Sequence, residues 1–156
     1  MPGPDFRRAN GFGLLELMVA LVVFSLMAAL AVPAYSGFVN RAKVSGAIGD
    51  IGSLAIEIER FSVSNNDRLP MTLDELPMEI PLDPWGNEYE YFNIRAAGPG
   101  NGPFRKDGNL NPLNTDFDLY SRGADGDSAG PLSAGKSRDD VVRANNGAFI
   151  GLGEDY

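Results

Sequence analysis

The chain of 156 residues contains no cysteine and no histidine. These absences exclude disulfide scaffolds, thiol nucleophiles, Cys/His zinc sites and every catalytic mechanism that depends on imidazole. Cations are also few, because 13 lysines and arginines stand against 21 acids and the formal net charge is -8. Nucleic-acid binding needs cations that contact phosphate, so this charge argues against it. The length fits one ordinary domain.

The apolar residues are concentrated near the N-terminus. Residues 12–35 are almost wholly apolar, and the part from Leu17 to Val32 carries no charge. As an α-helix rising about 1.5 Å per residue, the segment reaches about 36 Å, which is enough to cross a bilayer core of about 30 Å. Arg7 and Arg8 precede it and no cation follows closely, so the N-terminus is expected in the cytoplasm. The sequence therefore predicts one membrane-spanning helix.

A cleaved secretory signal peptide is the simplest alternative for this segment. Residues 29–31, Ala-Leu-Ala, would serve as its small-residue cleavage site. Glu16, however, lies inside the apolar run, where an acid costs about 2.5–3.5 kcal/mol at a helix centre and somewhat less near an end. Pro33 stands beside the cleavage point, and an amphipathic pattern continues beyond it. Both residues favour a retained segment over a disposable signal.

The stretch that surrounds Glu16 resembles the N-terminus of type IV pilins and pseudopilins. In that family a short basic leader ends in glycine, and a prepilin peptidase cleaves after it and N-methylates the new first residue, usually phenylalanine. Cleavage after Gly11 would make Phe12 the first residue. Glu16 would then be the fifth residue and Pro33 the twenty-second, which is the spacing of the family's acid and proline. The second mature residue is glycine, where the family usually has threonine or serine.

The resemblance implies a role for Glu16 in filament assembly. A buried carboxylate needs a partner, and the α-amine that cleavage creates at Phe12 of a neighbouring subunit would provide one. The pair would set the axial register of the subunits, as a buried polar residue does in a coiled coil. In the alternative, Glu16 only reaches the membrane surface from the start of the helix. The predicted assembly residues are Phe12, Glu16 and Pro33.

The changing composition along the chain, together with what the resemblance implies about cleavage and assembly, predicts four parts. They are a cleaved leader at 1–11, a membrane or filament-core helix at 12–35, an amphipathic continuation of that helix at 36–64, and a β-rich head at 65–156. In the continuation, apolar residues recur at steps of three and four along one helical stripe. The residues of this stripe are Val44, Ile48, Ile51, Ala55 and Ile58.

The head is predicted to be small and rich in loops. A helical turn with a capping box is expected at 72–76, because Thr72 is a suitable N-cap and Glu75 follows three residues later. Glycine, proline and asparagine predict a loop at 96–114. Strands are predicted at 88–94, 116–121 and 148–152. The fold class is α+β, and the resemblance implies the type IV pilin-like fold, in which a long N-terminal helix packs on a small antiparallel sheet followed by a C-terminal loop.

Two motifs in the head narrow the resemblance. Residues 82–87, Leu-Asp-Pro-Trp-Gly-Asn, predict a tight turn, because proline fixes one φ, glycine frees another and Trp85 adds a large apolar anchor. Together with a following tyrosine, this pattern looks like the major pseudopilin of type II secretion systems. Residues 118–126, Asp-Leu-Tyr-Ser-Arg-Gly-Ala-Asp-Gly, resemble the strand and turn that lead into a calcium-binding loop in the same family.

That second motif implies calcium as a cofactor. The ligands would be the Asp125 carboxylate, the backbone carbonyl of Arg122, and a later acid at Asp139 or Asp140. Calcium takes six to eight oxygens, and a bound ion would hold a loop that has little core of its own. The intervening loop is longer than in most members and carries two cations, which would weaken a calcium site or replace the ion with salt bridges. A solvated acidic loop without a metal is the alternative.

The function that the resemblance implies is structural. The chain would be the major subunit of the periplasmic pseudopilus of a type II secretion system, a helical homo-oligomer that pushes exoproteins through an outer-membrane secretin. It would be a single-pass inner-membrane protein with its head in the periplasm. Its partners would be the prepilin peptidase, minor pseudopilins, an inner-membrane platform protein and its assembly ATPase, with no nucleic acid.

Two other classes of function are weighed against this one. A major pilin of a type IV pilus would serve adhesion or twitching motility, but many such pilins close a C-terminal loop with a disulfide, which this chain lacks. A membrane-anchored enzyme without histidine or cysteine would depend on carboxylates, lysine, tyrosine or serine. Turns and loops explain Asp83, Asp118 and Asp125 better than catalysis does. The chain is therefore not expected to be an enzyme.

Overall fold

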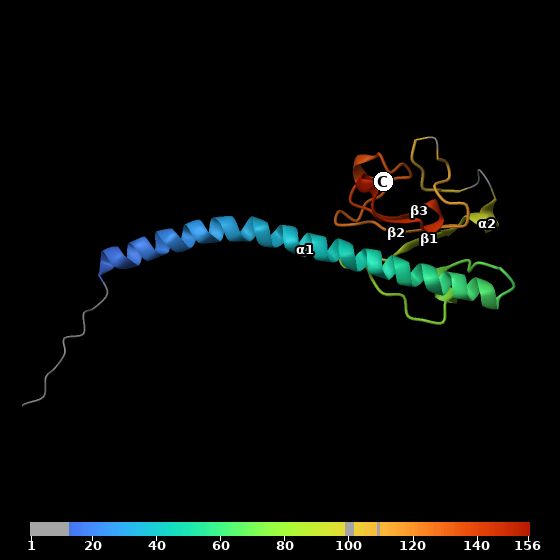
Figure 1. The fold of residues 1–156 in the computed structure, drawn as a ribbon, viewed down its shortest axis with the longest axis horizontal. Helices are drawn as coiled ribbons and strands as arrows, with labels where there is room; N and C mark the ends of the chain where they lie inside the picture. Colours follow the sequence, from blue (N-terminus) through green and yellow to red (C-terminus); the bar gives the residue numbers. More distant parts are fainter. Residues whose placement is uncertain (1–12, 99–101, 109) are drawn as a thin grey trace, which may run out of the picture. The chain divides into compact units, whose positions relative to one another are not determined.

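The computed structural model describes residues 13–98, 102–108 and 110–156. By its internal contacts the chain forms two compact units, Met1–Val39 and Asn40–Tyr156. One helix, α1 (Leu14–Ser64), contributes to both units (Figure 1). By length and composition this helix can cross a membrane, as the sequence predicts.

The first unit consists of the apolar part of α1. Its large side chains are exposed along the whole segment, with Leu14 at 78% and Phe24 at 71%. The Ser25 hydroxyl, the one polar side chain between Leu17 and Val32, donates to the carbonyl oxygen of Leu21 at 2.8 Å, so it is satisfied inside the helix. A helix that is apolar all round needs lipid or other apolar helices as its surroundings.

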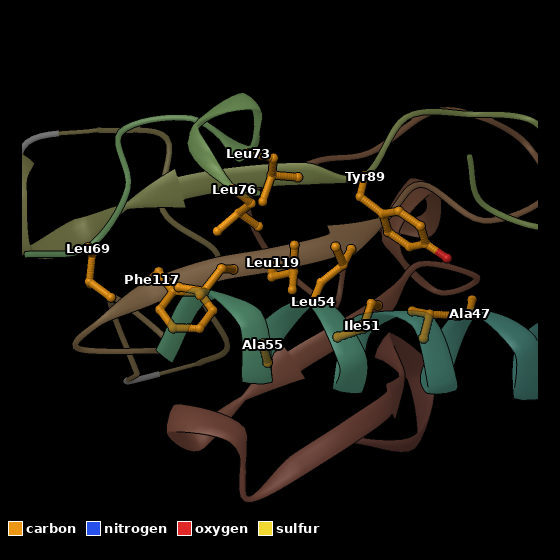
Figure 2. Close-up of a cluster of buried hydrophobic side chains, with 12 residues drawn as sticks. Ala47, Ile51, Leu54, Ala55, Leu69, Leu73, Leu76, Tyr89, Phe117 and Leu119 are labelled. Atoms are coloured by element: carbon orange, nitrogen blue, oxygen red, sulfur yellow. The ribbon is translucent and has the colours of Figure 1, made fainter. Parts of the chain in front are cut away.

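In the second unit, α1 packs its apolar stripe on the sheet. The predicted residues Ile51, Ala55 and Ile58 are buried, and Val44 and Ile48 are partly buried against the same core. Figure 2 shows side chains of α1 pointing toward the sheet and toward the segment that follows the helix. The buried residues opposite the helix are Leu69, Leu73, Leu76, Tyr89, Phe117, Leu119 and Val141.

The sheet has 4 antiparallel strands in the order β1-β2-β3-β4. Their bounds are β1 (Glu90–Asn93), β2 (Phe117–Ser121), β3 (Val141–Ala144) and β4 (Phe149–Leu152). The three predicted strands are confirmed with shorter bounds, while β3 was not predicted. All four residues of β3 are buried, so it shows no alternation, and Arg143 interrupts its apolar sequence. The α+β class and the pilin-like combination of long helix and small sheet are confirmed.

In the described part of the second unit there are also five short helices. They are η1 (Leu73–Glu75), α2 (Ile94–Ala97), η2 (Gly135–Ser137), η3 (Asn145–Gly147) and η4 (Gly153–Asp155). Of these, α2 begins at Ile94, the last residue of the predicted strand at 88–94, and covers the first two residues of the predicted loop at 96–114.

The predicted helical turn is confirmed as η1, but the predicted capping box is wrong. The Thr72 side chain makes no cap bond, because the backbone N–H of Glu75 already donates to the Thr72 carbonyl oxygen. Glu75 Oε1 instead accepts from the backbone N–H of Met71 at 3.0 Å. This bond, helped by Arg68, holds the pKa of Glu75 below its usual value.

Candidate functional site

The predicted processing and assembly residues belong to the first unit. Gly11 and Phe12 lie outside the described residues. Glu16 is an exposed acid in the first turn of α1, and its Oε2 accepts one long hydrogen bond, of 3.4 Å, from the backbone N–H of Gly13. Pro33 lies within α1. Because one long hydrogen bond uses little of the accepting capacity of a carboxylate, Glu16 stays available to a stronger donor.

The turn at residues 82–87 is organised by one buried carboxylate. Asp83 is 4% exposed, and its Oδ1 accepts from the backbone N–H groups of Trp85 at 3.0 Å and Asn87 at 2.8 Å. Its Oδ2 accepts from the Ser121 hydroxyl at the end of β2. The carboxylate therefore closes the turn and also attaches it to the sheet.

The same turn positions the start of the acidic loop. The side-chain amide of Asn87 donates to the carbonyl oxygen of Gly123 at 3.1 Å, and the Gly123 N–H donates to the Ser121 hydroxyl at 3.1 Å. The two sequence motifs, which look independent along the chain, thus form one structure. The sequence predicts each motif, but no local pattern indicates that Asn87 reaches a carbonyl 36 residues away.

Replacing Asp83 with alanine is expected to lower the free energy of unfolding by about 2 kcal/mol, since it leaves the buried Ser121 hydroxyl and the half-buried N–H groups of the turn without their acceptor. Urea unfolding of the full-length protein in detergent measures this, with Trp85 fluorescence as the reporter inside the turn. Asp74→Ala, which removes an exposed acid of η1, is the matched control. Equal stability of the two variants would show that the carboxylate does not anchor the turn.

Two of the predicted calcium ligands lie together. Asp139 Oδ2 accepts from the backbone N–H groups of Ala124 at 2.8 Å and Asp125 at 3.1 Å. Asp125 Oδ1 in turn accepts from the backbone N–H of Asp127 at 2.8 Å. The Asp127 carboxylate pairs with Lys136 at 2.7 Å, and this contact lowers the pKa of Asp127.

Asp140 does not join that pair. Its side chain is 0% exposed, and its Oδ2 accepts from Arg105 at 2.5 Å and from the Ser128 hydroxyl at 2.6 Å. Desolvation raises the pKa of Asp140 above its usual value, while the bond from Ser128 and the charge of Arg105 oppose that rise. The side chain of Arg122 pairs with Glu90 of β1, a contact that does not involve the Arg122 carbonyl. Oδ2 of Asp140 is therefore committed to donors of the protein itself, whereas its Oδ1 is buried without a hydrogen-bond partner among the described residues.

The structure brings the predicted calcium ligands together only in part, because Asp125 and Asp139 lie together whereas Asp140 is paired with Arg105. Among the residues that the structure describes, no three acidic side chains are grouped so that they could hold a metal ion. Calcium needs six to eight oxygens, and Asp125 and Asp139 supply only two carboxylates of the predicted set. Calcium binding by this chain thus stays a prediction from the resemblance.

Sequence reasoning missed Arg105 altogether. It lies between Phe104 and Lys106 in the segment predicted as a loop, yet it is 2% exposed. An arginine in a loop rich in glycine and proline is ordinarily a solvated surface cation. Only its distant partners reveal its burial, because Asp140 lies 35 residues further along the chain.

Comparisons with known proteins extend the similarity from the motifs to most of the chain. The family model of the prokaryotic N-terminal methylation motif matches residues 6–32. The chain is 31% identical over 145 residues to the type II secretion system core protein G of Pseudomonas aeruginosa, with 80% of this chain and 89% of that protein covered. It is 30% identical over 143 residues to the protein of the same name from Aeromonas hydrophila, with 78% and 87% covered. No solved structure matches the chain.

Proposed function

Because the chain belongs to the family of the type II secretion system core protein G, we propose that it is the major structural subunit of a type II secretion pseudopilus. The observation that carries this proposal is the similarity to core protein G over 80% of this chain and 89% of the relative. The role is structural, with α1 as the assembly element and the second unit as the exposed body of the subunit.

The exposed apolar part of α1 supports a subunit whose helix moves from surrounding lipid into contact with other subunits. Lipid tails and neighbouring apolar helices are about equally apolar, so the helix can leave the membrane for a filament core at modest net cost. The specific register of neighbouring helices then has to come from polar groups, and Glu16 is the acid in this segment. In our proposal, the α-amine of Phe12 in the next subunit neutralises Glu16 and sets the register of the filament.

Processing and location follow from the same segment. We propose that a prepilin peptidase removes residues 1–11, and that the matched methylation motif at 6–32 marks this reaction. Arg7 and Arg8 would keep the leader on the cytoplasmic side, which leaves the second unit in the periplasm of a cell with an inner membrane. Minor pseudopilins, a platform protein and its ATPase would complete the assembly.

Deleting the gene in its own host tests the proposed function. We expect exoproteins to be retained in the periplasm, because the filament that drives them through the secretin is missing. Plasmid-borne wild-type protein should restore their release. Immunogold microscopy at native expression should detect no surface appendages that contain this chain. Surface filaments together with intact exoprotein release would contradict the proposal and favour a type IV pilus.

A further inference from the structure

A buried cation stands at the base of the C-terminal loop. Arg105 comes from the segment between α2 and β2, and its side chain is 3% exposed. One guanidinium nitrogen, Nη2, donates to Asp140 Oδ2. The other, Nη1, donates to the Ala129 carbonyl oxygen at 2.7 Å and to the Ser128 hydroxyl. The two terminal nitrogens therefore contact one carboxylate, one carbonyl and one hydroxyl oxygen, while the buried Nε has no hydrogen-bond partner among the described residues.

Arg105 is also fixed to the sheet. Its backbone N–H donates to Asp118 Oδ2 of β2 at 2.7 Å, and its guanidinium lies over the Tyr120 ring at 4.3 Å from the centroid. Asp118 is buried, and desolvation raises its pKa despite the hydrogen bonds that it accepts. A guanidinium keeps its charge at every ordinary pH, and its rigid fork suits several oxygens at once. Arg105 is thus a preorganised cation, held from β2.

The backbone around Arg105 joins the same loop. The N–H of Lys106 donates to the Gly130 carbonyl oxygen at 3.0 Å, and the N–H of Leu132 donates to the Lys106 carbonyl oxygen at 2.9 Å. The segment that carries Arg105 therefore runs beside residues 128–132, the middle of the acidic loop. Through Asp140, which immediately precedes β3, the cation also reaches the far end of that loop.

We propose that this chain closes its C-terminal loop with an internal cation, the Arg105 guanidinium, in the structural role that the resemblance assigns to calcium. The oxygens around Arg105 belong to the classes that calcium takes, namely carboxylate, hydroxyl and carbonyl. One guanidinium and one carboxylate form a neutral pair, so no additional ion is needed to balance Asp140. The stability of the second unit is then independent of calcium.

The acids that remain have protein partners as well. Asp139 accepts from two backbone N–H groups, Asp125 from one, and Asp127 is paired with Lys136. These contacts distribute the negative charge of the loop over donors that the chain itself supplies. In this proposal Arg105, which lies outside the acidic region in sequence, contributes more to closing the loop than the two cations inside it, Lys136 and Arg138.

Thermal unfolding of the full-length protein in detergent, followed by near-UV circular dichroism, tests this proposal in millimolar calcium chloride and in EGTA. The midpoint of the wild-type protein is expected to be the same in both. Arg105→Met should lower it by about 10 °C in both conditions, because it leaves the buried Asp140 carboxylate unpaired. Arg95→Met, at an exposed pair with Asp67, is the matched control and should shift the midpoint by at most about 2 °C.

The double variant Arg105→Met/Asp140→Asn provides a second measurement. It removes both charges, so it should recover part of the loss that Arg105→Met causes. If Arg105→Met does not fold, the calcium comparison on the wild-type protein still decides. A midpoint that rises by several degrees in calcium, and no longer does so in Asp139→Asn, would overturn the proposal. So would an Arg105→Met variant as stable as Arg95→Met.

Discussion

Replacing Glu16 by glutamine is expected to abolish pseudopilus assembly and exoprotein release while leaving membrane insertion intact. In the assembled filament the glutamine would leave the α-amine of a neighbouring Phe12 buried without a counter-charge. Breaking one partner of a buried ion pair costs about 3–5 kcal/mol, and the loss recurs at each subunit contact of a filament. Insertion should become easier, since an acid in the apolar run costs up to about 2.5–3.5 kcal/mol.

Exoprotein activity in the culture medium and filaments in membrane extracts measure this effect. Mass spectrometry of the membrane fraction should still find a mature chain that begins with N-methylated Phe12, which separates assembly from processing. Glu59→Gln, at an exposed acid in the second part of α1, is the matched control and should secrete normally. Normal filaments from the Glu16 variant would refute its role in register, and a wild-type chain that begins at Val32 would restore the ordinary signal peptide.

The sequence predicts those parts of the fold whose signals are local. The stripe of α1 repeats every three to four residues, so Ile51, Ala55 and Ile58 could be assigned to the core without a structure. Alternating residues marked β1 and β2 in the same way. The strand β3 has no such signal, because both of its faces are covered and the buried Arg143, paired with Asp116, looks like a surface residue in the sequence.

The candidate sites differ in the same way: some are marked by a local sequence pattern, and others depend on contacts between distant residues. Glu16 and Pro33 are identified by spacing within one segment, which a sequence records directly. The link from Asp83 to Ser121 and the pair of Arg105 with Asp140 join residues 38 and 35 positions apart. Such pairs depend on how the loops fold back on the sheet. The local sequence around each residue does not indicate which residue it will contact. The resemblance offered Asp139 or Asp140 as the later calcium ligand, and nothing in the sequence near Asp140 indicates its pairing with Arg105.

Alanine at position 123 is expected to destabilise the second unit strongly. Gly123 has φ 65, and a Cβ added there would stand 2.2 Å from the Asp139 carbonyl oxygen and 2.8 Å from Asp139 Oδ2. The left-handed conformation alone costs a non-glycine residue about 1–2 kcal/mol. The contact with a backbone oxygen is also too short, so either the turn or the segment that precedes β3 must move. The total loss of unfolding free energy should be about 3–5 kcal/mol.

Two other glycines separate the backbone cost from the clash. Gly86 also has a positive φ, of 97, but its added Cβ would meet nothing within 4 Å, so Gly86→Ala should lose only about 1–2 kcal/mol. Gly135 lies in η2 with open space around it, and Gly135→Ala should change stability little. Urea unfolding of the three variants should therefore give Gly123→Ala a much lower free energy of unfolding than Gly86→Ala. Equal losses would mean that Asp139 yields freely to the added methyl group, and that the turn at Gly123 is not tightly packed against it.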